Sequence, residues 1–462
     1  MTIWRPDLRH RSGPRYRAIA DAVADDVARG ALEEGARLPT HRDLAAVLGV
    51  TVGTVSRGYA EAQRRGLISG EVGRGSFVRR DRARGLDLGM PARGEPVLVD
   101  LSLNFPVGEV EDRELAKALA ALGRTKDLAR LLEYLPHAGM TRHREAGAAW
   151  VARSGTPAHA AQIIVCSGAQ HGLAIALAAL TAPGDVVLTE ALTYPVFKTL
   201  AGLLRLKVQG LVMDEQGIVP EAVEAACKSS APKILYCIPT IQNPTAIVMP
   251  ETRRRRLAAV AQAHGLTILE DDIYGLLPAD RPPPLARHAP ESTVYVTSLS
   301  KTIAPGLRIG YLCAPRPLIE RMIPAIAATT WMAPPLMAEI ASRWIDNGTA
   351  DAILRRKRAQ AAERQKLAAR ILKTSGSDAH PSGYHLWLPL PEPWRGADFA
   401  TRLRERGVAV TPAEVFVAGS AKAPPAVRLC LGAARTADRL ERALRVVAGM
   451  LEGTHQPELS VV

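Results

Sequence analysis

No lysine occurs before Lys117, although the chain of 462 residues contains 59 lysines and arginines. The basic charge of the N-terminal region is therefore carried by arginine alone, the side chain best suited to phosphate groups and to guanine. Over the whole chain the formal net charge is +13. Such a charge favours a polyanionic partner.

Cysteine is also scarce, and long apolar runs are missing. The five cysteines are scattered, odd in number and without the spacing of metal ligands. We therefore expect free thiols in a reducing cytoplasm, with neither a disulfide nor a metal site. The N-terminus has no apolar signal core, and the longest apolar run, at about 173–182, is too short to span a bilayer. These features predict a cytoplasmic protein with no membrane partner.

The length of the chain and the position of its polar stretches predict two domains. A hydrophobic content of 47% can support two cores, one of them large. Arginine, glycine and proline fill a stretch at about 79–96 that has no sustained apolar period, as in a linker. We therefore predict a first domain at 1–80, a linker at 81–97 and a larger domain at 98–450.

The first domain has the pattern of three helices followed by a hairpin. Apolar residues recur at helical spacing from residue 14 onward, and Thr40 is a good N-cap for a second helix that ends at Gly49. Thr51 can cap a third helix that runs to about residue 65, and two short strand patterns with glycines follow up to residue 78. This order predicts an α+β winged helix-turn-helix; the alternative is an ordinary helical hairpin.

Residues 14–80 resemble the winged-helix DNA-binding domain of GntR-type regulators. The resemblance implies contacts with a double-stranded DNA operator, at phosphates or base edges, by Arg42, Thr51, Thr54 and Arg57. Arg74, at the tip of the predicted wing, can enter a minor groove. Val52 stands where many relatives carry an arginine, so it stays open which residues contact the DNA bases. Each of these arginines can instead belong to a solvated helix face.

The larger domain alternates strand and helix patterns. Three apolar runs read as buried strands: 186–188, 234–238 and 294–296. Such alternation predicts an α/β domain with a mostly parallel sheet. A small α+β C-terminal subdomain is expected from about residue 344, because 355–372 has the pattern of a long polar helix and 383–388 that of a strand.

Lys301 stands among small hydroxyl residues, directly after the last of these strands. A lysine forms an imine with an aldehyde only if its amine loses a proton near neutral pH, which burial and neighbouring cations favour. Arg308 and the hydroxyl groups of Ser298 and Ser300 suit a phosphate held beside such an imine. Together they predict a site for pyridoxal 5'-phosphate (PLP). Taken alone, Ser-x-Ser-Lys would fit a solvated loop lysine.

An acidic cluster follows an apolar strand pattern at 266–274. A carboxylate there can face the pyridine nitrogen of PLP and keep it protonated, which makes the ring an electron sink. Asp271 is the first candidate and Asp272 the second. Tyr274 and Asn243 can hydrogen-bond the ring hydroxyl. Alternatively, the acids form a helix N-cap and the Asn-Pro pair a turn.

A second phosphate-binding element is predicted at 163–173, where a short strand, a turn of small residues and a helix start follow one another. Free N–H groups at a helix start can hold a phosphate, and the small residues at 167–169 let it approach closely. Tyr194 is a candidate for an aromatic ring that covers the cofactor ring. Alternatively, Tyr194 fills space in the core or in an interface.

Residues from about 98 to 450 resemble fold-type I aminotransferases, in particular the branch that includes aminoadipate and kynurenine transaminases. The resemblance implies that Lys301 forms the internal aldimine and that Asp271 pairs with the pyridine nitrogen. Tyr274 and Asn243 then bind the ring hydroxyl. The resemblance also implies that the Tyr194 ring stacks on the cofactor ring. The phosphate site that it implies is formed by Gly168, Ala169, Gln170, Ser298, Ser300 and Arg308.

The same resemblance implies two contacts beyond the cofactor. Arg428 resembles the arginine that grips the α-carboxylate of an amino acid through two bonds; a surface strand arginine is the alternative. Tyr134 resembles a tyrosine that reaches the phosphate of the partner subunit, which implies a homodimer. Two departures concern substrate fit: Ala246 stands where the family usually has glycine, and 136–142 follows the usual turn only loosely.

The whole chain resembles the MocR-type subgroup of GntR regulators, which joins the two kinds of domain in this order. The resemblance implies a PLP-dependent, DNA-binding transcriptional regulator that senses PLP or an amino compound by aldimine exchange at Lys301. The main alternative is a catalytically active aminotransferase that moves an amino group from an amino acid to a 2-oxo acid. A third possibility is that PLP only supports folding and dimerisation.

Overall fold

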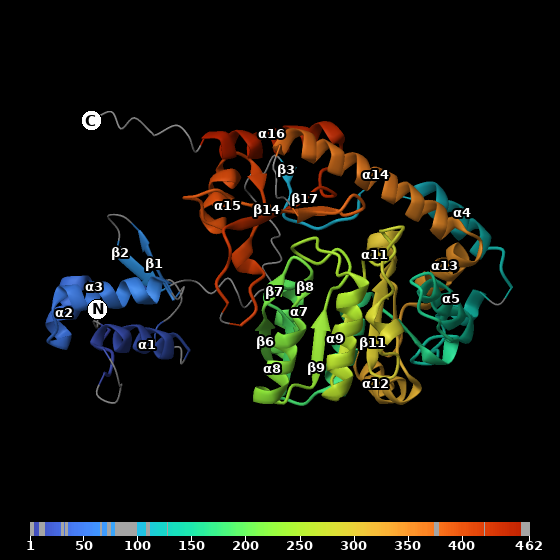
Figure 1. The fold of residues 1–462 in the computed structure, drawn as a ribbon, viewed down its shortest axis with the longest axis horizontal. Coiled ribbons are helices and arrows are strands. Elements are labelled where there is room, and N and C mark those ends of the chain that lie inside the picture. Colours follow the sequence, from blue (N-terminus) through green and yellow to red (C-terminus); the bar gives the residue numbers. More distant parts are fainter. Residues whose placement is uncertain are drawn as a thin grey trace. The chain divides into compact units, whose positions relative to one another are not determined.

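The computed structural model describes residues 4–8, 14–28, 32, 36–64, 67–71, 75–78, 99–107, 111–126, 128–373, 378–419 and 421–453. The chain divides into two compact units, residues 1–87 and 88–462 (Figure 1). Across the described ranges, no helix combines the length and the apolar character that crossing a membrane requires.

The first unit contains three helices and a β-hairpin: α1 (Arg15–Ala28), α2 (His41–Leu48), α3 (Val52–Arg64), β1 (Ile68–Glu71) and β2 (Gly75–Val78). Thr40 caps α2 by accepting a hydrogen bond of 3.2 Å from the Asp43 amide, and Gly49 ends the helix at φ 63°. Every helix and both strands contribute apolar side chains to the core, among them Ile19, Leu44, Val55, Ile68 and Val78. The predicted winged helix-turn-helix is confirmed.

The second unit is built on a seven-stranded sheet in the order β4-β12-β11-β10-β9-β5-β6. All its pairs are parallel except the two that β12 makes. Most of the strand residues are buried, which explains the unbroken apolar runs in the sequence. The strands are β4 (Ile163–Cys166), β5 (Val186–Glu190), β6 (Lys207–Leu211), β9 (Ile234–Cys237), β10 (Thr267–Asp271), β11 (Thr293–Ser298) and β12 (Gly310–Cys313). The predicted mostly parallel sheet is confirmed.

Helices cover both faces of this sheet. Leu235 and Ile268 pack with residues of α8, α9 and α10, whereas their strand neighbours Tyr236 and Leu269 pack with residues of α5, α6 and α12. Figure 1 shows α8 and α9 beside β9. The helices of this layered part are α5 (Thr141–Ala152), α6 (Ala169–Leu180), α7 (Pro195–Leu203), α8 (Pro220–Ser230), α9 (Glu251–Ala263), α10 (Leu285–His288), α11 (Leu299–Thr302) and α12 (Arg316–Thr329).

A smaller antiparallel sheet, in the order β13-β14-β17-β16, forms a second core in this unit. Its strands are β13 (Asp378–Ala379), β14 (His385–Pro389), β16 (Thr411–Pro412) and β17 (Ala426–Cys430). The helices that accompany it and connect it to the larger sheet are α4 (Asp112–Leu122), α13 (Pro335–Asp346), α14 (Thr349–Leu372), α15 (Gly396–Glu405) and α16 (Ala437–Glu452).

The first described residues after the predicted linker join this small core. β3 (Val99–Asp100) pairs in parallel with β15 (Val408–Ala409). Val99 and Leu101 are buried in the same cluster as Leu388 and Leu429. Segment 99–107 is therefore fixed to residues that lie far away in the sequence.

Candidate functional site

The candidate residues lie where strands of the large sheet end. Gly168 follows β4, Tyr194 follows β5 and Asn243 follows β9, while Asp271 and Ser298 are the last residues of β10 and β11. These strands all run in the same direction, because β4 and β11 both pair antiparallel with β12, which lies between them. The carboxyl ends of parallel strands form one edge of the sheet, where open α/β sheets bind ligands. The sheet therefore brings together residues that lie up to 130 positions apart in the sequence.

Lys301 lies on α11, immediately beyond β11. Its ammonium group donates a hydrogen bond to the main-chain carbonyl of Asn104. Burial lowers the pKa of Lys301 to about 8, and the positive charges of Arg428 and Arg308 act in the same direction, against Cys430 and Asp271. The amine can thus be neutral near physiological pH, as attack on an aldehyde requires.

Asp271 is almost fully buried at the end of β10. Its Oδ2 accepts a hydrogen bond of 2.8 Å from the hydroxyl group of Tyr236. Its Oδ1 has no hydrogen-bond partner among the described residues. Burial raises the pKa of Asp271 to about 7, and the positive charge of Lys301 is one of the effects that oppose this rise. The carboxyl group can therefore hold a proton shared with a buried partner.

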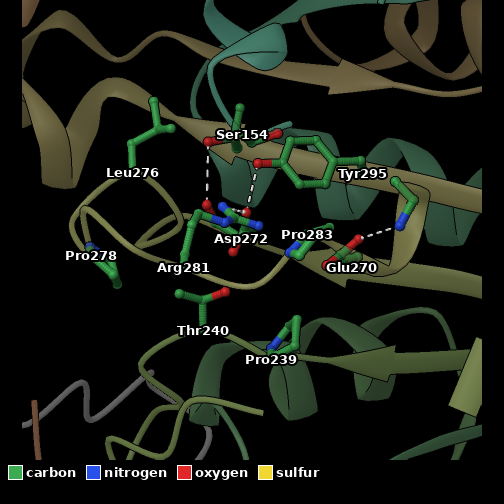
Figure 2. A network of polar contacts seen from close by, with 12 residues as sticks. Ser154, Pro239, Thr240, Glu270, Asp272, Leu276, Pro278, Arg281, Pro283 and Tyr295 are labelled. Atoms are coloured by element: carbon green, nitrogen blue, oxygen red, sulfur yellow. Dashed lines mark hydrogen bonds and ion pairs between the residues drawn. The ribbon is translucent and has the colours of Figure 1, made fainter. Parts of the chain in front are cut away.

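Asp272, the second candidate, belongs to a different network. Its Oδ2 pairs with the guanidinium group of Arg281 and accepts a hydrogen bond of 2.6 Å from the Tyr295 hydroxyl group. Figure 2 shows these three side chains together. Although burial would raise it, the pKa of Asp272 is lowered, mainly by the charge of Arg281. Because Arg281 already neutralises Asp272, Asp271 remains the candidate for the pyridine nitrogen.

Tyr274 and Asn243 both lie close to Arg428. Tyr274 accepts a hydrogen bond of 2.8 Å from the Asn104 side chain, and its environment includes the charges of Arg428 and Asp271. Asn243 accepts a hydrogen bond of 2.7 Å from Arg428 through Oδ1, which leaves its amide nitrogen able to donate to a ligand.

Arg428 is 7% exposed on β17. One terminal nitrogen contacts Asn243, and the other donates a hydrogen bond of 2.6 Å to the main-chain carbonyl of Ser102. Its Nε is buried without a hydrogen-bond partner among the described residues. An arginine in this state can exchange its internal acceptors for a carboxylate of a ligand.

The predicted phosphate residues also come together. Gly168 precedes the first turn of α6 at φ 86°, and a Cβ at this position would lie 2.7 Å from Nη2 of Arg308. Arg308 itself has φ 51°, a conformation that non-glycine residues adopt at a cost of about 1 kcal/mol or more. Its Nη1 contacts the hydroxyl oxygen of Ser300 at 3.5 Å, and Ser298 donates to the same oxygen at 2.9 Å. Ala169 and Gln170 are the first residues of α6.

The two predicted tyrosines differ in their surroundings. Tyr194 accepts a hydrogen bond of 3.0 Å from Gln170, and burial raises its pKa to about 12 in a pocket that it shares with Asp271. Tyr134 is instead 82% exposed, and its ring lies 5.5 Å from that of Trp331. Ala246, which departs from the usual glycine, has φ 62° and so adopts the backbone conformation that favours glycine.

In the first unit, the candidate DNA-contacting residues lie on α2 and at the start of α3. Arg42 is exposed. The hydroxyl groups of Thr51 and Thr54 form a hydrogen bond of 2.9 Å with each other, and the Thr51 oxygen caps α3 by accepting from the Thr54 amide. The guanidinium group of Arg57 lies 4.5 Å from the centre of the Tyr16 ring.

Arg74 lies outside the described residues. β1 and β2, which flank its position, pair in the register Ile68↔Val78 and Glu71↔Gly75. The hairpin that carries this arginine in the sequence is thus present, but no contact of its side chain is described.

Sequence reasoning missed four residues of the site: Ser102, Asn104, Tyr236 and His385. Tyr236 lies on a strand that the sequence predicts, but no motif pairs it with the carboxyl group that it contacts. Ser102 and Asn104 precede Arg428 and Lys301 by 326 and 197 positions. Long-range contacts such as the pairing of β3 with β15 bring segment 99–107 to the site, and no local sequence pattern predicts them.

Comparison with known proteins gives two family matches. A model described as "aminotransferase class I and II" matches residues 96–447, and one described as "bacterial regulatory proteins, gntR family" matches residues 15–78. Both matches stand in the order predicted from the sequence.

Similar proteins include regulators and aminotransferases. The chain is 30% identical to the uncharacterized HTH-type transcriptional regulator YdeF of Bacillus subtilis, over 97% of each chain. It is 30% identical to the HTH-type pyridoxine biosynthesis transcriptional regulator PdxR of Corynebacterium glutamicum, over 65% of this chain and 66% of that protein. A structure of the α-aminoadipate aminotransferase LysN of Thermus thermophilus, complexed with N-(5'-phosphopyridoxyl)-L-leucine, has a TM-score of 0.70 at 24% identity, covering 77% of this chain and 92% of that one.

Proposed function

Because the chain belongs to the aminotransferase class I and II family over residues 96–447 and carries a GntR-family domain at 15–78, we propose that it is a PLP-dependent transcriptional regulator of the MocR type. Relatives whose names identify them as HTH-type transcriptional regulators support this reading, since one of them aligns over nearly the full length. The observation that carries the proposal is the convergence of Lys301 with the buried side chains of Asp271 and Arg428, whose charges act on its amine.

The residues of the pocket fit PLP on their own chemistry. Asp271 and Arg428 each have a buried polar atom without a hydrogen-bond partner among the described residues, so each can still bind a ligand. Gly168 leaves space beside Arg308 that a Cβ would fill. Bound PLP supplies an aldehyde that reacts with amines and a ring that takes up electrons.

Each residue then has a distinct role. Lys301 would provide the neutral amine that holds PLP. Asp271 holds a proton at the pyridine nitrogen, with Tyr236 fixing its other oxygen. Arg308, the hydroxyl groups of Ser298 and Ser300 and the start of α6 would hold the phosphate, since N–H groups at the start of a helix can bind an anion.

Arg428 selects among amino compounds. Its guanidinium group matches a carboxylate through two parallel hydrogen bonds. A ligand carboxylate would take the place of the internal acceptors, Asn243 and the Ser102 carbonyl. The proposed effector is therefore an amino acid or another amine that also carries a carboxylate.

We propose a homodimer on the evidence of an exposed apolar surface. Leu132 and Tyr134 are 88% and 82% exposed, and Trp331 and Leu336 nearby are also exposed. A second copy of the chain would cover this surface and place Tyr134 near the partner's phosphate site. Sedimentation of Leu132→Asp tests this: a monomer is expected, and a dimer as stable as that of the unsubstituted protein would contradict it.

The regulatory function is tested with a double-stranded DNA fragment that the protein itself selects from a random pool. Its affinity is measured without cofactor, with PLP, and with PLP plus each of the common amino acids. We expect the affinity to change with PLP or with PLP and one amino acid, and the change to disappear in Lys301→Ala. Equal affinity in all three conditions would leave PLP with a structural role only.

The alternative function, transamination, is favoured by the same convergence of Lys301, Asp271 and Arg428. It is distinguished by turnover. Steady conversion of an amino acid and a 2-oxo acid at about one per second or faster would identify an enzyme. Binding of the amino acid that changes the PLP spectrum once, without continued product formation, would identify a sensor.

A further inference from the structure

His385 is fully buried at the start of β14, and none of the roles above accounts for it. Its Nε2 lies 3.0 Å from the main-chain carbonyl oxygen of Gln242. Its Nδ1 lies 3.1 Å from the side-chain nitrogen of Asn104. The imidazole ring thus joins the loop after β9 to segment 99–107.

These two contacts determine which ring nitrogen carries the hydrogen. Burial lowers the pKa of His385 to about 3, and the charge of Arg428 adds to this effect, so the ring is neutral. A neutral imidazole has one N–H group and one bare nitrogen. A carbonyl oxygen can only accept, so Nε2 carries the hydrogen and donates it to Gln242. Nδ1 is therefore an acceptor.

The acceptor at Nδ1 in turn orients Asn104. Only the amide nitrogen of Asn104 can donate a hydrogen bond to it. The amide nitrogen of Asn104, and not its amide oxygen, therefore faces His385. The second hydrogen of the same nitrogen is donated to the Tyr274 hydroxyl oxygen at 2.8 Å. With the amide reversed, two acceptors would face each other at His385.

The Tyr274 hydroxyl oxygen consequently accepts a hydrogen bond from Asn104, and the Tyr274 hydroxyl hydrogen can be donated to another partner. Burial raises the pKa of this phenol well above its ordinary value, so the hydrogen stays in place. Tyr274 is 1% exposed, so that hydrogen must be directed at an acceptor inside the pocket.

We propose that His385 is a positioning residue which, through Asn104, fixes Tyr274 as a hydrogen-bond donor toward the ring oxygen of bound PLP. The inference rests on the proposed function. A donated hydrogen bond draws charge from that oxygen and weakens its hold on the proton that it shares with the Lys301 nitrogen. We call the chain of hydrogen bonds from His385 through Asn104 to Tyr274 the relay. The pH at which the visible absorption of bound PLP changes is then lower than it would be without this relay.

Other groups also influence that pH. The charged and titratable groups that act on His385 or Tyr274 are Lys301, Arg428, Asp271, Tyr194 and Cys430. None of them is altered in the variants below, so their contribution is common to all.

The test uses the full-length protein loaded with PLP. His385→Phe keeps a ring of similar size without nitrogens, and His385→Gln retains one donor and one acceptor. Tyr274→Phe removes the donated hydrogen bond itself and is expected to raise the midpoint of the pH titration by about one unit or more. We expect a rise in the same direction for His385→Phe and a midpoint near that of the unsubstituted protein for His385→Gln.

The outcomes separate this inference from the proposed function. If the unsubstituted protein acquires no visible band with PLP, the proposed function fails. If the band forms and Tyr274→Phe shifts its midpoint while His385→Phe does not, the positioning role is wrong.

Two measurements do not depend on the stability of His385→Phe. Asn104→Ala removes the amide but keeps the carbonyl that Lys301 contacts, and it should raise the midpoint as well. Nitrogen NMR of the ring in the unsubstituted protein should show hydrogen on Nε2 and none on Nδ1. The opposite tautomer, or an unchanged midpoint in Asn104→Ala, would overturn the relay.

Discussion

Lys301 donates a hydrogen bond to the main-chain carbonyl of Asn104, a residue 197 positions earlier in the sequence. Arg428 makes the equivalent contact with the Ser102 carbonyl at 2.6 Å. Both acceptors belong to segment 99–107, which follows the predicted linker directly. The two cations proposed to meet an amine and a carboxylate are thus held by the part of the domain nearest in sequence to the DNA-binding unit.

PLP held by the Lys301 nitrogen would compete with the Asn104 carbonyl, and a ligand carboxylate bound to Arg428 would compete with the Ser102 carbonyl. We therefore expect amide hydrogen exchange in 99–107 to become faster when PLP is added and when an effective amino acid is added to the PLP-bound protein, because each ligand weakens a contact of this segment. Peptides from β9 provide the internal control, since their hydrogen bonds within the sheet are unaffected. Unchanged exchange in 99–107 at saturating ligand would show that the carbonyls are not displaced.

The pKa of Lys301 predicts a pH dependence for capture of PLP by the cofactor-free protein. The reactive amine is the neutral form, whose fraction rises about tenfold per pH unit below the pKa. Since that pKa is about 8, the rate should rise up to this pH and then level off. Stopped-flow absorbance measures the rate, and Lys301→Ala should show none of this phase. A rate that continued to climb to about pH 10, as for an ordinary lysine, would contradict the assigned environment.

Asp271 and Asp272 are neighbours with opposite expected effects on stability. The pKa of Asp271 in the folded protein is about 7, above its ordinary 3.8, so its contribution to stability falls as pH rises between these values and is lost above them. Asp271→Asn should therefore stabilise the cofactor-free protein at pH 8, by roughly 2–4 kcal/mol.

Asp272→Asn is the matched control, because it removes the partner of the buried Arg281. It should destabilise by about 3–5 kcal/mol at the same pH. Denaturant midpoints of the second unit, followed for both variants in parallel, provide the comparison. Shifts of the same sign would contradict the division of roles between the two carboxyl groups.

The sequence predicts the residues that surround the lysine but not what holds them. Lys301, Asp271 and Gly168 could be identified because each follows a recognisable strand, and the ends of parallel strands meet at one edge of a sheet. The winged helix could be predicted because Thr40 and Gly49 mark the ends of a helix locally. These sequence patterns arise from residues that are close together in the chain.

The rest of the site depends on contacts between distant segments. Asn104 follows a strand of two residues, too short to produce a periodic pattern, and it is brought to the site by long-range contacts such as the pairing of β3 with β15. His385 lies in a predicted strand, yet its partners come from two separate loops. Its buried neutral ring could equally have been part of an apolar core, so only the positions of Asn104 and Gln242 reveal its function as an acceptor and donor.

Gly168 provides a test of the phosphate site. Alanine there would have both an unfavourable φ of 86° and a Cβ 2.7 Å from Nη2 of Arg308. Gly184→Ala is the matched control, because Gly184 has φ 94° but no atom within 4 Å of its Cβ position. Both should cost about 1 kcal/mol in fold stability, but only Gly168→Ala should weaken PLP binding, by about tenfold or more. Equal PLP affinities in a spectrophotometric titration would place the phosphate elsewhere.

Arg42 offers the clearest test of the DNA-binding surface. Arg57 is less suitable, because its guanidinium group packs on the Tyr16 ring, so Arg57→Ala also removes a contact between α3 and α1. Arg42 is exposed and, if it contacts a phosphate, Arg42→Ala should weaken binding to all duplex sequences similarly.

The plot of log affinity against log salt should lose about one unit of slope in Arg42→Ala, because one phosphate contact fewer releases about one counterion fewer. Arg124→Ala makes the same change in net charge at an exposed position of the second unit and serves as the control. Fluorescence anisotropy over a range of salt concentrations measures both slopes. If the slope falls by the same amount in both variants, the effect comes from net charge and not from a contact of α2 with the DNA backbone.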